Sequence, residues 1–248
     1  MKIVEAPSVY LIGKQIVDEE QLGQFLDAND IKGWATDADG GQKLVEVAGR
    51  VCYMSFSNPR PGGNKAYIEH ILEVGHGSVA EHCVFTLLIE GVSRSLTHEL
   101  VRHRHFSPSQ LSQRYCDRVA FVKPPGIGGI ASEAIWERSL REAVDSYELL
   151  LVELDRDFAH IEDKTLRRKR VREAARAVLP NCTETKIVLT GNARTWRNFL
   201  ELRGSIHADQ EIQVLASRVF DLLREAAPNI FGDYKVTMSG LETEYRKV

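Results

Sequence analysis

The sequence lacks the long apolar runs that cross membranes or direct secretion. A membrane-spanning helix needs about 20 consecutive apolar residues, and no stretch of the chain reaches that length. The N-terminus carries Glu5 and Pro7 where a signal peptide would have its apolar core. We therefore expect a cytoplasmic protein with no membrane partner.

Cysteine is also scarce, with four residues in 248, and these are scattered as Cys52, Cys83, Cys116 and Cys182. No two of them have the C-x-x-C spacing of a metal or redox motif. In a chain without a secretion signal, such cysteines are expected to be reduced and to serve packing. Cys116 lies within the basic segment described below, beside Arg114 and Tyr115, and we do not expect it to be a catalytic thiol.

Two further absences concern cofactor binding and domain organisation. The chain has no G-x-G-x-x-G fingerprint of a dinucleotide-binding domain. It also has no internal repeat, low-complexity tract or clear linker, and its 43% hydrophobic and 27% charged residues are typical of a globular protein. One domain over residues 1–248 is the simplest expectation, with residues 1–43 the least informative part.

Positive charge is concentrated in one segment. Between Arg94 and Arg118 there are five arginines against two acids, in a chain whose formal net charge is -3. A local positive patch on a mildly acidic protein indicates a bound anion, whereas a general nucleic-acid surface would require a basic domain. Arginine suits an anion site, because its planar fork donates paired hydrogen bonds to phosphate, to carboxylate or to an imide edge.

The same segment leaves two other function classes open. His98, Glu99, His103 and His105 could suggest a metal hydrolase, which a chelator would inhibit. His98 and His103 are five residues apart, however, and on a helix this places them on different faces, so we expect no metal site. A non-catalytic nucleotide- or RNA-binding protein would use the same arginines for phosphates, and its affinity would fall steeply with salt.

Hydrophobic periodicity predicts a mixture of strands and helices. Strands are expected at 8–17, 84–90, 119–122, 183–190 and 234–237, and helices at 44–52, 64–72, 92–103, 132–160, 163–176, 192–203 and 209–226. We expect residues 18–42 to be irregular and residues 107–112 to form a loop. Asn64 and Asn192 are expected to cap the helices that follow them.

Three motifs carry a resemblance to a known family. Arg102, His103 and Arg104 are followed after seven residues by Ser112; HGSVAEH spans residues 76–82; and NARTWRNFLELRGSIH spans residues 192–207. With AARAVLP at residues 174–180, they resemble the flavin-dependent thymidylate synthases, usually called ThyX, over roughly residues 44–237. From its residues alone, HGSVAEH is better explained as a turn capped by Ser78 with hydrogen-bonded histidines, and the resemblance is what makes it a flavin site.

The resemblance implies a methyltransferase that converts dUMP to dTMP. The implied carbon donor is 5,10-methylenetetrahydrofolate, the reductant is NADPH, and FAD carries hydride and methylene. No cysteine nucleophile is implied, and none of the four cysteines has the Pro-Cys-His setting of ordinary thymidylate synthases. The implied fold is α+β and ThyX-like, a single domain with a mostly antiparallel sheet and packed long helices, assembled as a homotetramer with flavin sites between subunits.

The resemblance also implies site residues. Arg203 would lie against the imide edge of uracil and stabilise negative charge developing there, which is electrostatic catalysis. The expected dUMP contacts are Glu99, Arg102, Gln110, Leu111, Ser112, Gln113, Arg114, Arg176 and Arg203. The expected FAD contacts are His76, Ser78, Glu81, Arg102, His103, Arg104, Gln110, Asn192, Arg194, Asn198 and His207. Ser112 is assigned to substrate positioning, because a serine without an adjacent base is a weak nucleophile.

Overall fold

The computed structural model describes residues 1–116 and 119–246, and Asp117 and Arg118 of the basic segment therefore lie outside the described residues. The chain is a mixed α+β protein, as predicted. Its contacts divide it into two compact units: the first comprises Met1–Ser8, Ile89–Arg102 and Ser109–Ile187, and the second Val9–Leu88, His103–Pro108 and Val188–Val248. The units interleave along the sequence, so each is described by itself.

Four antiparallel strands form the main sheet in the order β2-β3-β6-β4. Their bounds are β2 Ser8–Lys14, β3 Val84–Ser93, β6 Glu184–Asn192 and β4 Ser107–Gln110. Side chains of β3 and β6 alternate between buried and partly exposed, which is the period-2 pattern that made these two strands predictable. The prediction of a loop at 107–112 was wrong for residues 107–110, because β4 is an edge strand, where Pro108 is tolerated without a backbone N–H.

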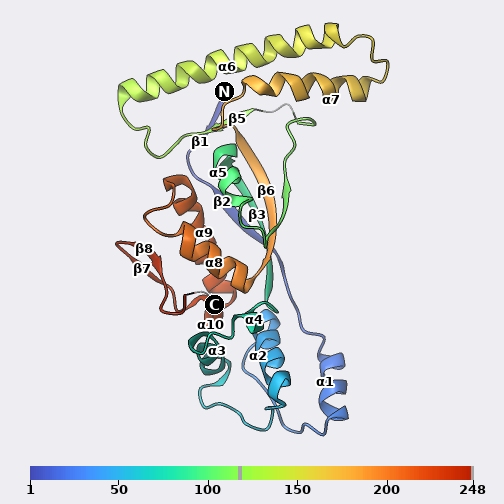
Figure 1. Ribbon diagram of the computed structural model, residues 1–248, viewed down its shortest axis with the longest axis vertical. Helices are drawn as coiled ribbons and strands as arrows, with labels where there is room; N and C mark the ends of the chain where they lie inside the picture. The colour runs from blue at the N-terminus through green and yellow to red at the C-terminus, as the bar shows by residue number, and fades with distance from the viewer. Residues whose placement is uncertain (117–118, 247–248) are drawn as a thin grey trace. The chain divides into compact units, whose positions relative to one another are not determined.

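The second unit contains most of the helices. They are α1 Glu19–Ala28, α2 Gly40–Tyr53, α3 Gly63–Glu73, α4 Gly77–Ala80, α8 Ala193–Arg203, α9 Gln210–Ala226 and α10 Pro228–Phe231, with a hairpin of β7 Lys235–Thr237 and β8 Gly240–Glu242. Figure 1 shows α8 and α9 in orange beside this hairpin, and α8 contacts both α9 and β8. Trp196, Phe199, Leu215 and Phe220 are completely or almost completely buried there and form the core that holds α8.

A buried polar network joins α2, α3 and the start of α10 in the same unit. The Nδ2 group of Asn64 donates to Gln42 O at 3.1 Å and to Glu46 Oε2 at 2.8 Å, and Asn64 Oδ1 accepts from Asn229 at 2.9 Å. Glu46 also pairs with Arg50 at 2.8 Å, and both side chains are almost fully buried. The prediction that Asn64 caps α3 was therefore wrong: Gly62 occupies the N-cap, and the amide of Asn64 is used inside the core.

The first unit consists of a long helical hairpin and short strands. Strand β1 Lys2–Val4 pairs in parallel with β5 Ala120–Val122, and α5 Arg94–Leu100 follows β3. Helix α6 Ile130–Asp157 lies side by side with α7 Lys164–Ala175, as Figure 1 shows, and a short 3-10 turn at Arg176–Val178 follows α7. Within the described residues no helix is long and apolar enough to span a bilayer.

Two other predictions of local structure were wrong. Residues 18–42 were expected to be irregular, but Asp18 accepts a hydrogen bond from the backbone of Gln21 and starts the ten-residue helix α1. The helix expected at 92–103 is shorter, because Val92 and Ser93 still belong to β3, and the Ser93 hydroxyl caps α5 by accepting from Leu96 N at 3.0 Å. His103 consequently lies beyond the end of α5.

Candidate functional site

Helix α8 begins directly where strand β6 ends, and Asn192 makes the junction. Its Oδ1 accepts from Thr195 N at 2.8 Å and from the Thr195 hydroxyl at 2.9 Å, which confirms the predicted cap. The cap uses the amide oxygen, so a hydrogen bond from Asn192 to a ligand would come from its Nδ2 group. The polar residues at the start of α8 are thereby fixed at the end of a rigid strand.

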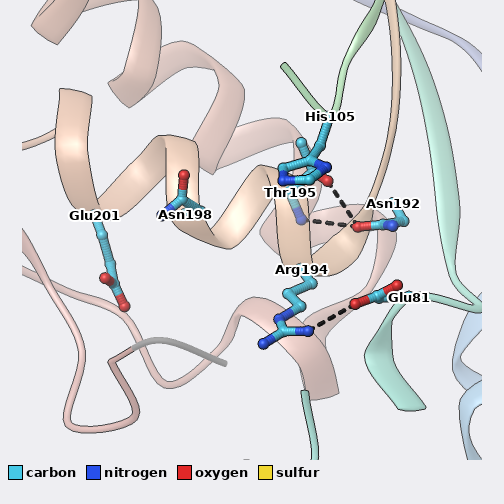
Figure 2. Close-up of a pocket in the computed structure, with 7 residues that line it drawn as sticks. All are labelled: Glu81, His105, Asn192, Arg194, Thr195, Asn198 and Glu201. Atoms are coloured by element: carbon cyan, nitrogen blue, oxygen red, sulfur yellow. Dashed lines mark hydrogen bonds and ion pairs between the residues drawn. The ribbon is translucent and has the colours of Figure 1, made fainter. Parts of the chain in front are cut away.

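A cavity of about 440 Å³ opens beside this junction. It is lined by Glu81, His105, Asn192, Arg194, Thr195, Asn198 and Glu201. Figure 2 shows Arg194 extending from α8 toward Glu81, and the two side chains form an ion pair at 2.7 Å. Glu81 follows α4 and Arg194 lies 113 positions later, so two of the motifs in the sequence meet at one cavity. A volume in this range is typical of small-molecule sites.

His76 and Ser78 belong to the same motif as Glu81 but do not line that cavity. His76 is the N-cap residue of α4 and Ser78 lies inside this one-turn helix, and both side chains are exposed. The alternative that Ser78 caps a turn was wrong, since the start of α4 has no side-chain cap. His76 O instead accepts from Val79 N at 3.1 Å.

Arg203 ends α8 and contacts the motif that contains Arg102, His103 and Arg104. Its Nε donates to His103 Nε2 at 3.0 Å. The imidazole of His103 packs edge-on against Phe199, with ring centroids 5.5 Å apart, and also lies against Phe106. The structure thus brings together the residue expected at the pyrimidine and one expected at the flavin.

His207 lies apart from the first cavity. It is exposed and lines a second cavity of about 410 Å³ together with Ser205, Ser239 and Glu242, and Glu201 lines both cavities. Arg104 is exposed as well.

In the first unit, Gln110 and the residues after it form a tightly bonded segment. Gln110 Nε2 donates to the hydroxyls of Thr97 at 3.1 Å and Thr185 at 3.3 Å, and Leu111 N donates to Lys186 O at 2.9 Å. Ser112 then starts a turn, because its hydroxyl accepts from Arg114 N at 3.3 Å. The segment is positioned by backbone and threonine contacts before any ligand arrives.

Arg114 of this turn and two further arginines, Arg94 and Arg176, belong to the first unit. Arg114 forms an ion pair with Glu173 of α7 at 2.6 Å. Partial burial lowers the pKa of Arg94, and the positive charge of the nearby Arg176 lowers it further. Two guanidinium groups held near each other under partial burial are stabilised by an anion between them. Glu99 and Gln113 are partly buried in this unit, and Arg102 is exposed at its edge.

Four residues of interest were absent from the expected site. Arg94 precedes the signature and is recognisable only through its neighbour Arg176. His105, Thr195 and Glu201 line the first cavity, and all three lie within the spans of the motifs, which is the signal that could have identified them.

The assumption that His98 and His103 lie on one helix was wrong. His98 lies on α5 and His103 lies after that helix has ended, so the two do not share a helix. Among residues 1–116 and 119–246, no group of three or more His, Cys, Asp and Glu side chains is arranged to hold a metal ion.

Comparison with known sequences places these features in a family. A sequence model of the thymidylate synthase complementing protein matches residues 35–229. The chain belongs to this family. The flavin-dependent thymidylate synthases of Mycobacterium tuberculosis (strain ATCC 25618 / H37Rv) and Mycobacterium bovis (strain BCG / Pasteur 1173P2) are each 50% identical to it over 228 residues, covering 89% of this chain and 90% of theirs. That of Mycobacteroides abscessus is 49% identical over 225 residues.

A solved structure agrees with this family at the level of fold. The UMP/dUMP methylase PolB from Streptomyces cacaoi, crystallised with 5-Br UMP, superimposes with a TM-score of 0.67. The match covers 94% of this chain and 95% of that one at 21% identity. At this identity, the comparison shows that the thymidylate synthase complementing fold is shared.

Proposed function

We propose that this protein is a flavin-dependent thymidylate synthase, which methylates dUMP to dTMP with 5,10-methylenetetrahydrofolate as carbon donor and NADPH as reductant. The observation that carries the proposal is the single cavity lined by Glu81, Asn192, Arg194 and Asn198. These residues come from two motifs far apart in the sequence, and each was expected to contact FAD. Family membership and half-identical relatives with this name support the same reaction.

The residues at this cavity fit a flavin dinucleotide in their chemistry. Arg194 offers a guanidinium, Asn192 and Asn198 offer amide donors, and Glu81 holds Arg194 in place by their ion pair. These are the groups that bind phosphate and carbonyl oxygens when no glycine-rich fingerprint is present. Ser78, His76, Arg102, His103, Arg104, Gln110 and His207 are the further proposed flavin contacts. When bound, the flavin would carry the hydride and the methylene group.

The nucleotide would be held by arginines and the Ser112 turn of the first unit. Arg114, Arg176 and Arg94 can neutralise a phosphate, and the Ser112 hydroxyl can donate to it. Gln110 donates both N–H groups of Nε2 to threonines, so its Oε1 remains to accept a hydrogen bond from the sugar. Glu99, Arg102, Leu111 and Gln113 complete the proposed dUMP contacts.

Arg203 would act on the pyrimidine. A guanidinium at the imide edge stabilises negative charge on the ring and so raises its nucleophilicity without a cysteine adduct.

Replacing Arg203 by alanine tests this role. We expect turnover to fall by roughly two orders of magnitude or more, as for loss of a transition-state charge contact, while flavin stays bound. Steady-state dTMP formation and flavin absorbance of the purified variant measure the two effects. Turnover near that of the unmodified enzyme would remove Arg203 from the mechanism.

The function itself is tested by following NADPH oxidation anaerobically with FAD and methylenetetrahydrofolate present, with and without dUMP, and by assaying dTMP at the end. The proposal predicts that dUMP stimulates NADPH oxidation. It also predicts that the amount of dTMP formed equals the amount of NADPH oxidised in response to dUMP. An unchanged rate in the presence of EDTA is expected, whereas a metal hydrolase would be inhibited. Absence of both flavin binding and dTMP would overturn the proposal.

We also propose a homotetramer working in the cytoplasm. The exposed apolar side chains of α6 support an assembly, since Ile135, Leu149 and Val152 are 61%, 67% and 52% exposed in the single chain.

A further inference from the structure

The hydrogen bond between Arg203 and His103 defines the state of the imidazole. Nε of Arg203 is the donor and Nε2 of His103 is the acceptor, at 3.0 Å. A ring nitrogen that accepts a hydrogen bond carries no proton, so His103 is neutral with its hydrogen on Nδ1. A neutral ring does not compensate the charge of Arg203. What the contact fixes is the direction of the guanidinium plane.

The imidazole is itself held firmly by aromatic packing. Its ring lies 5.5 Å from Phe199 at an interplanar angle of 69° and 6.1 Å from Phe106. Phe106 in turn packs 4.4 Å from Trp196, and its backbone N–H donates to His103 O at 3.2 Å. Phe199 and Trp196 are fully buried and Phe106 is nearly so. The acceptor atom therefore has a fixed position.

Helix α8 supplies both sides of this arrangement. Phe199 and Arg203 are four residues apart, which places them one turn apart on the same face. The ring that packs on Phe199 is thus aligned with the side chain of Arg203. Gly204 ends the helix immediately afterwards, so Arg203 is its last residue and the hydrogen bond restrains a side chain at the end of the helix.

We propose that His103 is a positioning residue for Arg203, one that sets the plane of the guanidinium at the pyrimidine by accepting from its Nε. A guanidinium is rigid and planar, so fixing Nε also fixes the directions of both terminal nitrogens. Preorganised donors stabilise developing charge better than mobile ones, because they need no reorganisation during the reaction. The inference rests on the proposed role of Arg203 and deepens it.

The test compares His103→Leu, which removes the acceptor, with His103→Gln, whose side-chain oxygen can accept from Nε. With FAD saturating, we expect His103→Leu to lower kcat for dTMP formation about tenfold or more, the effect of one charge-assisted hydrogen bond. KM for dUMP should change by no more than about twofold. Because His103 is also a proposed flavin contact, the FAD dissociation constant, from a flavin absorbance titration, should rise, and saturating FAD keeps that rise out of kcat. His103→Gln should recover most of the rate. His70→Leu, on the surface of α3, is the control for histidine loss and should leave all three constants unchanged.

A double-mutant cycle separates this inference from the proposed function. If His103 acts through Arg203, His103→Leu should cost almost nothing further in the Arg203→Ala background. If the double variant loses kcat by the product of the two single-variant factors, the two residues act independently and the inference is overturned. A kcat for His103→Leu equal to that of the unmodified enzyme would also overturn it. Weakened FAD binding with a normal kcat at saturation would assign His103 to the flavin alone and also overturn it. Normal turnover of Arg203→Ala by itself would instead refute the role of Arg203.

Discussion

At the scale of single residues, Cys83 shows how burial decides reactivity. Its side chain is fully buried, and this burial raises the pKa of the thiol to about 12. At pH 8 the thiolate fraction is then roughly 10⁻⁴, and the thiolate is the reactive form. We expect iodoacetamide to modify the exposed Cys52 and Cys116 in the folded protein and to modify Cys83 only after unfolding in guanidinium. Peptide mass spectrometry over time measures this, and equal rates at Cys83 and Cys52 would contradict it.

Residue roles could be predicted from the sequence where the governing chemistry is local. Asn192 was predictable as a cap, because the residue type and the apolar run that follows it are adjacent. The contact between Arg203 and His103 spans 100 positions and follows from no local rule. Asn64 was misassigned for the same reason, since Glu46 and Asn229, which bind its side chain, are distant in sequence.

At the scale of elements, helix α8 is anchored by a charged residue inside the core. Arg197 is fully buried and forms a bidentate pair with Asp233, at 2.7 Å and 2.8 Å, and Nη1 also donates to Ile230 O at 2.6 Å. Burial opposes the charge and is the largest single effect, but the hydrogen bonds to Asp233 and the negative charges of Tyr234, Asp233 and Glu201 together outweigh it, so the pKa of Arg197 is raised. The ring of Tyr234 lies 4.9 Å from the guanidinium. The pair thus ties α8, which carries Arg194 and Arg203, to the C-terminal segment.

Removing one member of this pair should be costly. We expect Arg197→Met or Asp233→Asn to lower the free energy of unfolding by about 3–5 kcal/mol, because each leaves an uncompensated buried partner. The double variant should lose less than the sum of the single losses. The exposed pair of Lys235 and Glu244 is the matched control, and Lys235→Ala should change stability by less than about 1 kcal/mol. Urea denaturation measures all four variants, and a loss for Arg197→Met no larger than for Lys235→Ala would contradict the anchoring role.

Most elements were predictable because their hydrophobic period is strong. Strands β3 and β6 and helices α6, α8 and α9 were expected close to their observed bounds. Helix α1 was missed although Leu22, Phe25 and Leu26 have helical spacing in the sequence, and none of its ten residues is buried. The burial of Arg197 could have been predicted from the sequence. Ala193 and Leu200, four residues before it and three after it, place it on the apolar face of the helix, and both are buried in the structure.

At the scale of the whole molecule, the α+β class and the reaction were accessible from the sequence, but the division into two units was not. Each unit is built from three separated segments, and strands β3 and β6 contribute residues to both. Such an arrangement depends on long-range contacts, whereas domain boundaries in a sequence are recognised by linkers and changes in composition. The single uninterrupted family match over residues 35–229 agrees with the absence of a linker.

Helix α6 carries exposed apolar side chains that we expect to form an interface of the proposed tetramer. Only Leu140 and Tyr147 are buried among the 28 residues of α6, while Leu149 and Val152 lie one turn apart and are mostly exposed. Neighbouring apolar side chains on a long helix indicate a protein interface more strongly than isolated ones do. With a chain mass of 27.9 kDa, light scattering after size exclusion should give four times that mass, about 112 kDa.

Replacing Leu149 and Val152 together by glutamate should lower this mass, because burying two unpaired carboxylates opposes association. Lys65→Glu on α3, also exposed, should leave the mass unchanged and controls for the change in net charge. A mass near 28 kDa for the unmodified chain would contradict the tetramer. A mass of 112 kDa for the double variant would retain the tetramer and remove this part of α6 from its interface. If the flavin sites are completed between subunits, loss of mass and loss of flavin should occur together in the double variant.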